Sequence, residues 1–292
     1  MAFIQNLING IGLGSVYAII ALGYTMVYGI AKMLNFAHGD IIMIGGYVAF
    51  CTYTYLGWPV VAAIVASIII CTLLGITVEF LAYKPLRGAT SLAVLITAIG
   101  VSYFLQNIAL IIWTSNTKSF PNMVSFMPSV SIGDITISGT TIITIFACIL
   151  IMVGLTTFTS KTKLGKAMRA VSEDRGAAEL MGINVNVTIS LTFAIGSGLA
   201  AIAAILFLSA YPTLIPTTGS MPGIKAFTAA VFGGIGSIPG ALIGGILLGV
   251  IEILAKAYIS TQLSDAIVFA VLIIVLIFKP TGLLGKKIRE KV

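Results

Sequence analysis

The sequence predicts an all-α fold: a polytopic transmembrane helical bundle of about eight helical elements, with two broken or re-entrant segments. Of the 292 residues, 59% are apolar and only 9% are charged, whereas about a quarter of a soluble globular domain is charged. Several apolar runs also approach the roughly 20 residues that a helix needs to cross about 30 Å of hydrocarbon. This composition excludes a water-soluble enzyme and a disordered chain. It indicates one membrane domain over residues 1–292, with the lipid bilayer as its solvent.

The apolar stretches are predicted to be helices. Backbone amides in the bilayer core have no water to bond, so only helices or closed barrels span it. These runs are continuous, whereas the strands of a barrel alternate in polarity. The stretches lie at about residues 7–30, 40–56, 58–82, 91–113, 140–159, 188–210, 226–259 and 265–280.

The first stretch is expected to remain in the mature protein. The first basic residue is Lys32, so the N-terminus lacks the charged region of a cleaved signal peptide, and residues 7–30 are too long for one. The sequence NFAHGD, with Asn35, His38 and Asp40, then interrupts the apolar pattern. We therefore expect a break in the membrane before the second element.

Basic loops set the predicted orientation in the membrane, because short loops rich in lysine and arginine stay cytoplasmic during insertion. Stretches 91–113 and 140–159 are two spans that connect two such loops. Three spans precede the first of these loops, which places the N-terminus outside. The basic residues that follow the last stretch place the C-terminus in the cytoplasm. The same clustering accounts for the net charge of +7 without a nucleic-acid partner. The basic segments contain Lys84 and Arg87; Lys161, Lys163, Lys166, Arg169 and Arg175; and Lys279, Lys286, Lys287, Arg289 and Lys291.

The stretch 226–259 is too long for one ordinary span. It contains GGIGSIPGALIGG, whose glycines and proline end or bend a helix. We predict a half-helix, a break near residues 236–240 and then a full span. Both breaks precede a glycine pair, at residues 45–46 and 244–245, and paired interruptions are typical of repeated transporter folds, whose substrate pathway passes the broken helices. The residues expected on that pathway are Asn35, Phe36, His38, Gly236 and Ser237.

Glycines at intervals of four residues predict close helix packing. Without bulky side chains two backbones approach closely, and this is how helices associate in lipid, where no hydrophobic driving force acts between them. The glycines expected at such contacts are Gly10, Gly14, Gly240, Gly244, Gly245 and Gly249.

The sequence contains no catalytic constellation. His38 is the only histidine, the three cysteines lie in apolar runs, and no glycine-rich phosphate-binding loop is present. We therefore expect no metal, no cofactor and no catalytic residue in this chain. Glu252 and Lys256, four residues apart on one helix face, are predicted to pair. Glu79, near the cytoplasmic end of its span, is predicted to snorkel toward water.

The cytoplasmic segment 160–187 carries the strongest functional signal. It predicts one short helix, capped by Ser172, with acidic residues in its first turn and Gly182 at its end. Its small apolar face has nothing to bury in its own loop, so we expect it to dock into a groove on another protein. A solvated linker helix or a membrane-surface helix is the alternative. The residues assigned to the helix are Ser172, Glu173, Ala177, Ala178, Leu180, Met181 and Gly182.

The segment EDRGAAELMGIN resembles the loop through which permeases of ATP-binding-cassette importers engage their ATPase, with a glutamate-alanine-alanine and downstream glycine pattern. Glu173, Ala177, Ala178 and Gly182 match that pattern, although Arg175 and Gly176 interpose between the acidic residues and the alanines. The segments GLGSVYAIIALGYTMVYGIAKMLNFAHGDIIMIGGY and GGIGSIPGALIGGILLGVIE are similar to the two signatures of branched-chain amino acid (LIV-type) permeases. The similarity covers nearly the whole chain, and the short N-terminus and NFAHGD resemble the smaller, H-type member of the usual permease pair.

The resemblance implies a permease subunit that translocates leucine, isoleucine and valine. Its implied partners are a second permease subunit in a heterodimer, two cytoplasmic ATPase subunits that hydrolyse the ATP, and an extracytoplasmic substrate-binding protein. Two alternatives remain open from the residues. One is an ion- or proton-coupled secondary transporter or channel, which would work alone. The other is a permease of the same kind for urea, short amides or sugars.

Overall fold

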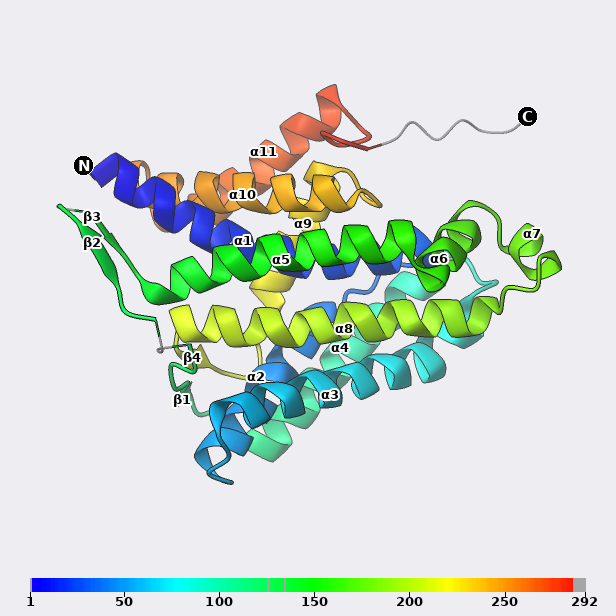
Figure 1. Cartoon of the computed structure of the whole chain (residues 1–292), viewed down its shortest axis with the longest axis horizontal. Helices are drawn as coiled ribbons and strands as arrows, with labels where there is room; N and C mark the ends of the chain where they lie inside the picture. Colours follow the sequence, from blue (N-terminus) through cyan, green and yellow to red (C-terminus); the bar gives the residue numbers. More distant parts are fainter. Residues whose placement is uncertain (1, 125–126, 134, 286–292) are drawn as a thin grey trace.

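The computed structural model describes residues 2–124, 127–133 and 135–285, and within them the chain folds into eleven α-helices (Figure 1). Six of the described helices are long and apolar enough to cross a membrane. The predicted class, a helical polytopic bundle, is therefore confirmed. The six are α1 (Ala2–Ala31), α3 (Val60–Val78, continued by a π turn at Glu79–Tyr83 and a 3-10 turn at Lys84–Leu86), α4 (Ser91–Trp113), α5 (Gly139–Lys161), α8 (Val185–Ala210) and α10 (Ile238–Tyr258).

Shorter elements complete the bundle and mark its two ends. The N-terminus and the strands lie at one end, and α6 and α7 lie at the other (Figure 1). Strand β1 pairs antiparallel with β4, and β2 with β3. The bounds are α2 (His38–Thr54), α6 (Lys163–Glu173), α7 (Arg175–Leu180), α9 (Ser220–Gly233), α11 (Ser264–Phe278), β1 (Lys118–Ser119), β2 (Val130–Ile132), β3 (Ile135–Ile137) and β4 (Thr213–Leu214).

The predicted half-helix, break and full span are confirmed as α9, residues 234–237 and α10. Gly234 and Gly236 have φ angles of +107° and +91°, a region that residues with a Cβ rarely adopt. Ser237 then caps α10 by accepting a hydrogen bond from the Gly240 N–H at 3.2 Å, which satisfies one of the free amides of the first turn.

Helices α2 and α9 both begin inside the bundle, and their N-termini touch. A Cβ built on Gly39 would lie 2.6 Å from the Gly219 carbonyl oxygen, so the backbones approach as closely as glycine permits. Gln106 of α4 bridges the two starts, with Nε2 at 2.8 Å from Asp40 and at 3.2 Å from Ser220. The structural counterpart of the first break is thus the linker 211–219. This linker, YPTLIPTTG, contains two prolines, ends α8 and lets α9 start at Ser220.

Helix α1 forms the centre of the bundle. In its most apolar window 94% of the residues are buried, against 17% for α4 and α5, whose outer faces are apolar and exposed. Most of the core belongs to one hydrophobic cluster that α1, α2, α8, α9 and α10 share. The bundle is thus arranged around α1, and α4 and α5 present apolar surface outward.

Glycines let α1 and α10 approach backbone to backbone. A Cβ on Gly10 would lie 2.8 Å from the Val250 Cα, one on Gly14 2.6 Å from the Ile246 Cα, and one on Gly245 2.5 Å from the Ala18 Cα; Gly249 faces Gly14 and Gly10. Gly240 and Gly244 instead face Gly233 of α9. The six glycines singled out in the sequence therefore lie at two helix contacts.

Glu79 is fully buried at the α6–α7 end, so the prediction that it snorkels was wrong. The chain turns sharply after the π turn, and Arg87 folds back to form an ion pair with Glu79. Ser190 of α8 donates a second hydrogen bond to this carboxylate at 2.6 Å. Arg87 also donates to Asn186. A buried carboxylate held in this way ties the end of α3 to the start of α8.

Replacing Gly245 by valine should destabilise the protein by about 1–3 kcal/mol, because the added side chain overpacks the contact of α10 with Ala18. Gly154 of α5 is the matched control, since a Cβ there meets nothing within 4 Å. Thermal aggregation of the detergent-purified protein, followed by fluorescence-detected size exclusion, measures the effect. Equal melting temperatures of the Gly245→Val and Gly154→Val variants would contradict the close contact assigned to α1 and α10.

Replacing Arg87 by methionine should cost about 3–5 kcal/mol, because it leaves the buried Glu79 carboxylate without its cation. Arg169→Met is the control, since that exposed guanidinium donates to the Ser160 carbonyl and forms no ion pair with any residue that the structure describes. The Glu79→Gln, Arg87→Met double variant should recover much of the loss. A double variant as unstable as Arg87→Met alone would show that the ion pair is not the cause.

Candidate functional site

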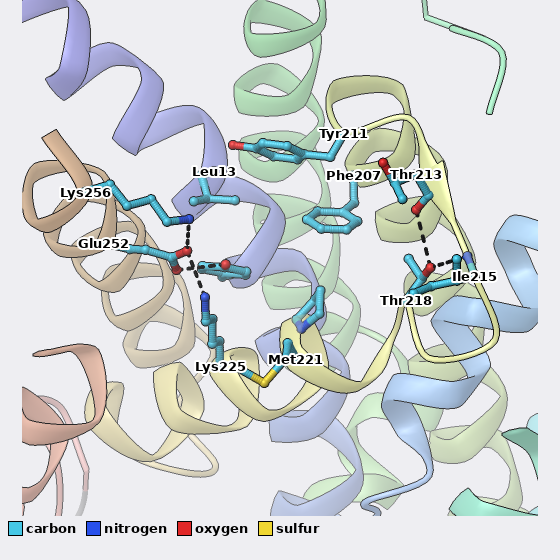
Figure 2. A pocket seen from close by; sticks show the side chains of 12 residues that line it. Leu13, Phe207, Tyr211, Thr213, Ile215, Thr218, Met221, Lys225, Glu252 and Lys256 are labelled. Carbon is cyan, nitrogen blue, oxygen red and sulfur yellow. Dashed lines mark hydrogen bonds and ion pairs between the residues drawn. The ribbon is translucent and has the colours of Figure 1, made fainter. Parts of the chain in front are cut away.

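A pocket lies next to strand β4, at the end of the bundle that holds the N-terminus and the strands (Figure 1). Figure 2 shows the side chains that line it. Its volume is about 290 Å³, and α1, α8, α9, α10 and the α8–α9 linker form its wall. The lining residues are Leu13, Tyr17, Phe207, Tyr211, Thr213, Ile215, Thr218, Met221, Pro222, Lys225, Glu252 and Lys256.

Buried charges form one side of this pocket. Glu252 is 1% exposed, and its carboxylate accepts hydrogen bonds from Lys225 at 2.8 Å, Lys256 at 2.6 Å and the Tyr17 hydroxyl at 2.9 Å. Lys225 also forms an ion pair with Asp265 at 2.7 Å. A buried carboxylate is tolerated only when it is paired and hydrogen-bonded, and these three donors meet that condition.

The predicted pair of Glu252 and Lys256 is confirmed, but sequence reasoning missed the second lysine and the tyrosine. Lys225 lies in the apolar segment MPGIKAF, and an unexplained lysine among apolar residues is the signal that marks it. Tyr17 gave no such signal, since it lies in α1, 235 residues from Glu252.

Of the residues expected on the pathway, Asn35 lines a small, nearly closed cavity, whereas Phe36, His38, Gly236 and Ser237 are not among its lining residues. Asn35 is buried, and its side-chain oxygen accepts a hydrogen bond from the Tyr83 hydroxyl at 2.9 Å. The His38 ring packs 4.6 Å from that of Tyr24, and the Phe36 ring 5.4 Å from that of Phe227. The cavity measures about 10 Å³, and its wall includes Asn35 and Tyr24 from one side and Phe227 and Ile235 from the other.

The two breaks therefore meet in space. Asn35 comes from the linker after α1, and Ile235 from the linker before α10. Gly236 also faces α1, with its Cα 3.3 Å from a Cβ built on Gly29. Ser237 caps α10 beside it. A volume of about 10 Å³ holds at most one water, so the space between the breaks is shut in this structure.

At the opposite end, the segment expected to form one helix forms two. Thr162 caps α6, and Asp174 caps α7 by accepting a hydrogen bond from the Ala177 N–H at 3.0 Å. The expected cap by Ser172 was wrong, because Ser172 lies within α6 and donates to the Arg169 carbonyl. Asp174 takes an extended backbone and starts the second helix, as N-cap residues do.

Gly182 ends α7 as predicted, with a φ of +79°. The Ile183 N–H bonds the Ala178 carbonyl at 3.0 Å, and the Gly182 N–H bonds the Glu179 carbonyl at 2.9 Å. This pair of bonds is a Schellman motif, which requires a left-handed residue at the glycine position. The short helix is thus closed at both ends by its own sequence.

The apolar face of α6 and α7 is partly used within the chain. Ala178 is 3% exposed and packs in the same cluster as Met168 and Val171 of α6, so the expectation that this face has no place to bury in the chain was wrong. Ala177 and Glu173 are exposed. Leu180 and Met181 are 90% and 81% exposed. These two side chains are the most exposed apolar residues of the segment, ahead of Val187 at 53% and Leu164 at 48%.

Arg175 connects α7 to the bundle. Its guanidinium donates to the Ala31 carbonyl at the last residue of α1. Burial and the neighbouring Arg87 lower the pKa of Arg175, although an arginine remains charged at neutral pH. The end of α1 is thereby linked to the helix that carries Leu180.

The chain is similar to known proteins over its full length. Residues 6–276 match the family described as branched-chain amino acid transport system / permease component. The chain is 46% identical to the high-affinity branched-chain amino acid transport system permease protein BraD of Pseudomonas aeruginosa, over 99% of this chain and 98% of that protein. It is equally identical, with the same coverage, to the corresponding permease protein LivH of Escherichia coli K12.

A more distant relative extends the match to an archaeon. The probable branched-chain amino acid transport permease protein LivH of Methanocaldococcus jannaschii is 27% identical, over 91% of this chain and 88% of that protein. The family match covers most of the sequence and nearly all of the described helices. This chain belongs to the family of branched-chain amino acid transport system permease components.

Proposed function

We propose that this chain is a permease subunit of an ATP-binding-cassette importer that carries leucine, isoleucine and valine across a bacterial plasma membrane. The observation that carries the proposal is the full-length 46% identity to BraD and LivH, both named as high-affinity branched-chain amino acid permease proteins. The six candidate spans agree with a polytopic membrane subunit. The chain has no catalytic task in this proposal, and ATP is hydrolysed on partner subunits.

The orientation proposed here puts α6 and α7 in the cytoplasm. Exposed basic residues gather at that end, including Lys161, Lys163 and Lys166, and such residues stay inside during insertion. The N-terminus and the charged pocket then face the extracytoplasmic side. The C-terminus is cytoplasmic in this proposal, because its basic residues would also stay inside during insertion. The basic residues Lys286, Lys287, Arg289 and Lys291 lie outside the described residues.

Four partners follow from this assignment: a second permease subunit, two cytoplasmic ATPase subunits and an extracytoplasmic binding protein. The exposed Leu180 and Met181 of α7 support the ATPase contact, because two large apolar side chains on a capped cytoplasmic helix are a typical anchor for a groove. The apolar outer faces of α3, α4 and α5 suit the acyl chains of the bilayer and the second permease.

In the proposed mechanism, α7 is a lever. Closure of the ATPases displaces α7, and the bond from Arg175 passes the displacement to the end of α1. Helix α1 contacts α8, α9 and α10, so its movement repacks the helices around the closed cavity between the two breaks. Such switching is a change between two packed states of the bundle. The pathway residues in this proposal remain Asn35, Phe36, His38, Gly236 and Ser237.

Replacing Leu180 and Met181 by aspartate should leave the permease folded but separate it from its ATPases. Loss of apolar anchors costs about 2 kcal/mol or more, which weakens binding roughly 30-fold. Co-purification of the ATPases and leucine uptake by reconstituted vesicles measure the effect. Leu56→Asp, an exposed apolar residue at the opposite end, should keep its ATPases. Normal co-purification of the double variant, or uptake by the permease without any ATPase, would contradict the proposal.

Cysteines placed at Asn35, Phe36, His38, Gly236 and Ser237 should react with a water-soluble thiol reagent in a state-dependent way. The background lacks Cys51, Cys71 and Cys148, and labelling of the full complex is compared with and without trapped ATP. The shut cavity predicts slow labelling in one state and several-fold faster labelling in the other. Ser67→Cys, fully buried where Ser67 bonds Gly45, should stay inert in both. If all five sites stay inert as well, the breaks are structural only.

A further inference from the structure

We propose that the charged pocket between α1, α8, α9 and α10 is a docking site for a zwitterionic amino acid with an apolar side chain. The inference rests on the proposed function, which makes the pocket face the side from which substrate arrives. It adds a binding site within the membrane subunit itself. The site would accept the amino acid after its delivery and before the cavity between the breaks opens.

The pocket has one polar wall and one apolar wall (Figure 2). Lys256 and Glu252 of α10 project from one side. Phe207 of α8 and Tyr211, directly after α8, project from the other side, with Leu13 above and Met221 below in that view. An amino acid with an apolar side chain carries charged groups and apolar surface close together. The wall of the pocket therefore offers charge for its backbone groups and apolar surface for its side chain.

The charge balance of the cluster favours a ligand with no net charge. Lys225 and Lys256 supply two positive charges, and Glu252 and Asp265 supply two negative charges. A cation or an anion would leave an uncompensated charge in a partly buried site, which is costly where water is scarce. A zwitterion adds one charge of each sign and keeps the balance.

The cluster also has free hydrogen-bonding capacity. An ammonium has three donors, and Lys256 uses one of them on Glu252 while its side chain is 35% exposed. Its remaining donors suit a substrate carboxylate. The free lone pair of Glu252 suits a substrate ammonium, since the bonds from Lys225, Lys256 and Tyr17 occupy three of about four acceptor sites.

The linker on the other side of the pocket is already ordered. The Thr218 hydroxyl accepts a hydrogen bond from the Ile215 N–H at 2.7 Å and lies 3.3 Å from the Thr213 carbonyl, so the linker is held as a fixed wall. At about 290 Å³ the pocket lies at the small end of ligand sites, which range over about 300–1,000 Å³. A preformed site of this size fits one small metabolite. Binding is weak, because substrate competes with ion pairs that already exist.

Protection from thiol labelling tests the site directly. Met221 is 43% exposed and lines the pocket, so Met221→Cys in the background without native cysteines reports on occupancy. The purified full-length chain in nanodiscs is labelled with and without L-leucine. At leucine about ten times the dissociation constant, mass action leaves roughly one site in ten free, and labelling should slow about tenfold. Leucinol, a cation, and 4-methylpentanoate, an anion, should not protect at the same concentration.

Variants of the cluster separate binding from folding. Lys256→Met should abolish protection, Lys256→Arg should retain part of it, and Glu252→Gln should weaken it; size exclusion of each variant shows that it remains folded. Lys118 lies at the same end of the bundle but outside the pocket. In the Lys118→Met variant, leucine should protect the cysteine at position 221 as well as it does in the parent. Equal protection by leucine, leucinol and 4-methylpentanoate, or none by leucine, would overturn the proposal.

Measuring uptake by the reconstituted importer distinguishes a failure of the pocket inference from a failure of the proposed function. If leucine is taken up but never protects Met221→Cys, the pocket inference fails and the importer assignment stands. If no branched-chain amino acid is taken up, the importer assignment fails. Protection that distinguishes the zwitterion from the two charged analogues would still support the pocket in that case.

Discussion

The close contact of α1 with α10 is the constraint on which the other arrangements depend. Glycines on both helices let the backbones meet, and no side chain separates them at Gly14 and Gly249. This contact places the Tyr17 hydroxyl against Glu252. The same helix extends to Ala31, where it accepts the bond from Arg175. One rigid element therefore reaches from the charged pocket to α6 and α7, and its position is set by backbone approach in a lipid environment.

Two buried carboxylates of this bundle, Glu79 and Glu252, lie in compensated clusters. Glu79 has Arg87 and Ser190, and Glu252 has two lysines and a tyrosine. Each cluster joins helices that are distant in sequence, so the ion pairs specify which helices are neighbours as well as offsetting the desolvation of a buried carboxylate. The first cluster lies beside the proposed lever, and the second forms the wall of the pocket.

Local sequence properties predicted the helices, while the contacts between them needed the structure. Continuous apolar runs predicted the membrane spans, and Gly182 and the region of Gly236 predicted where helices end. These features act within one or two helical turns, so they can be recognised in the sequence. The start of α9 was missed, since Lys225 and the prolines of the linker conceal a helix that is buried in the interior. Arg87 and Glu79 are only eight residues apart, yet their pairing depends on a turn that no periodicity reveals. Ala178 was assigned to a partner because burial against the chain's own bundle is a tertiary property.

The glycine contact between α1 and α10 and the outward faces of α4 and α5 differ in how many substitutions they can accept. On the outward faces of α4 and α5 any apolar side chain satisfies the acyl chains, and positions such as Gly100 and Gly154 have open space around them. Along α1 and α10 even one added methyl group meets backbone. Mutational drift is therefore tolerated on the rim of the bundle and removed by selection at its axis.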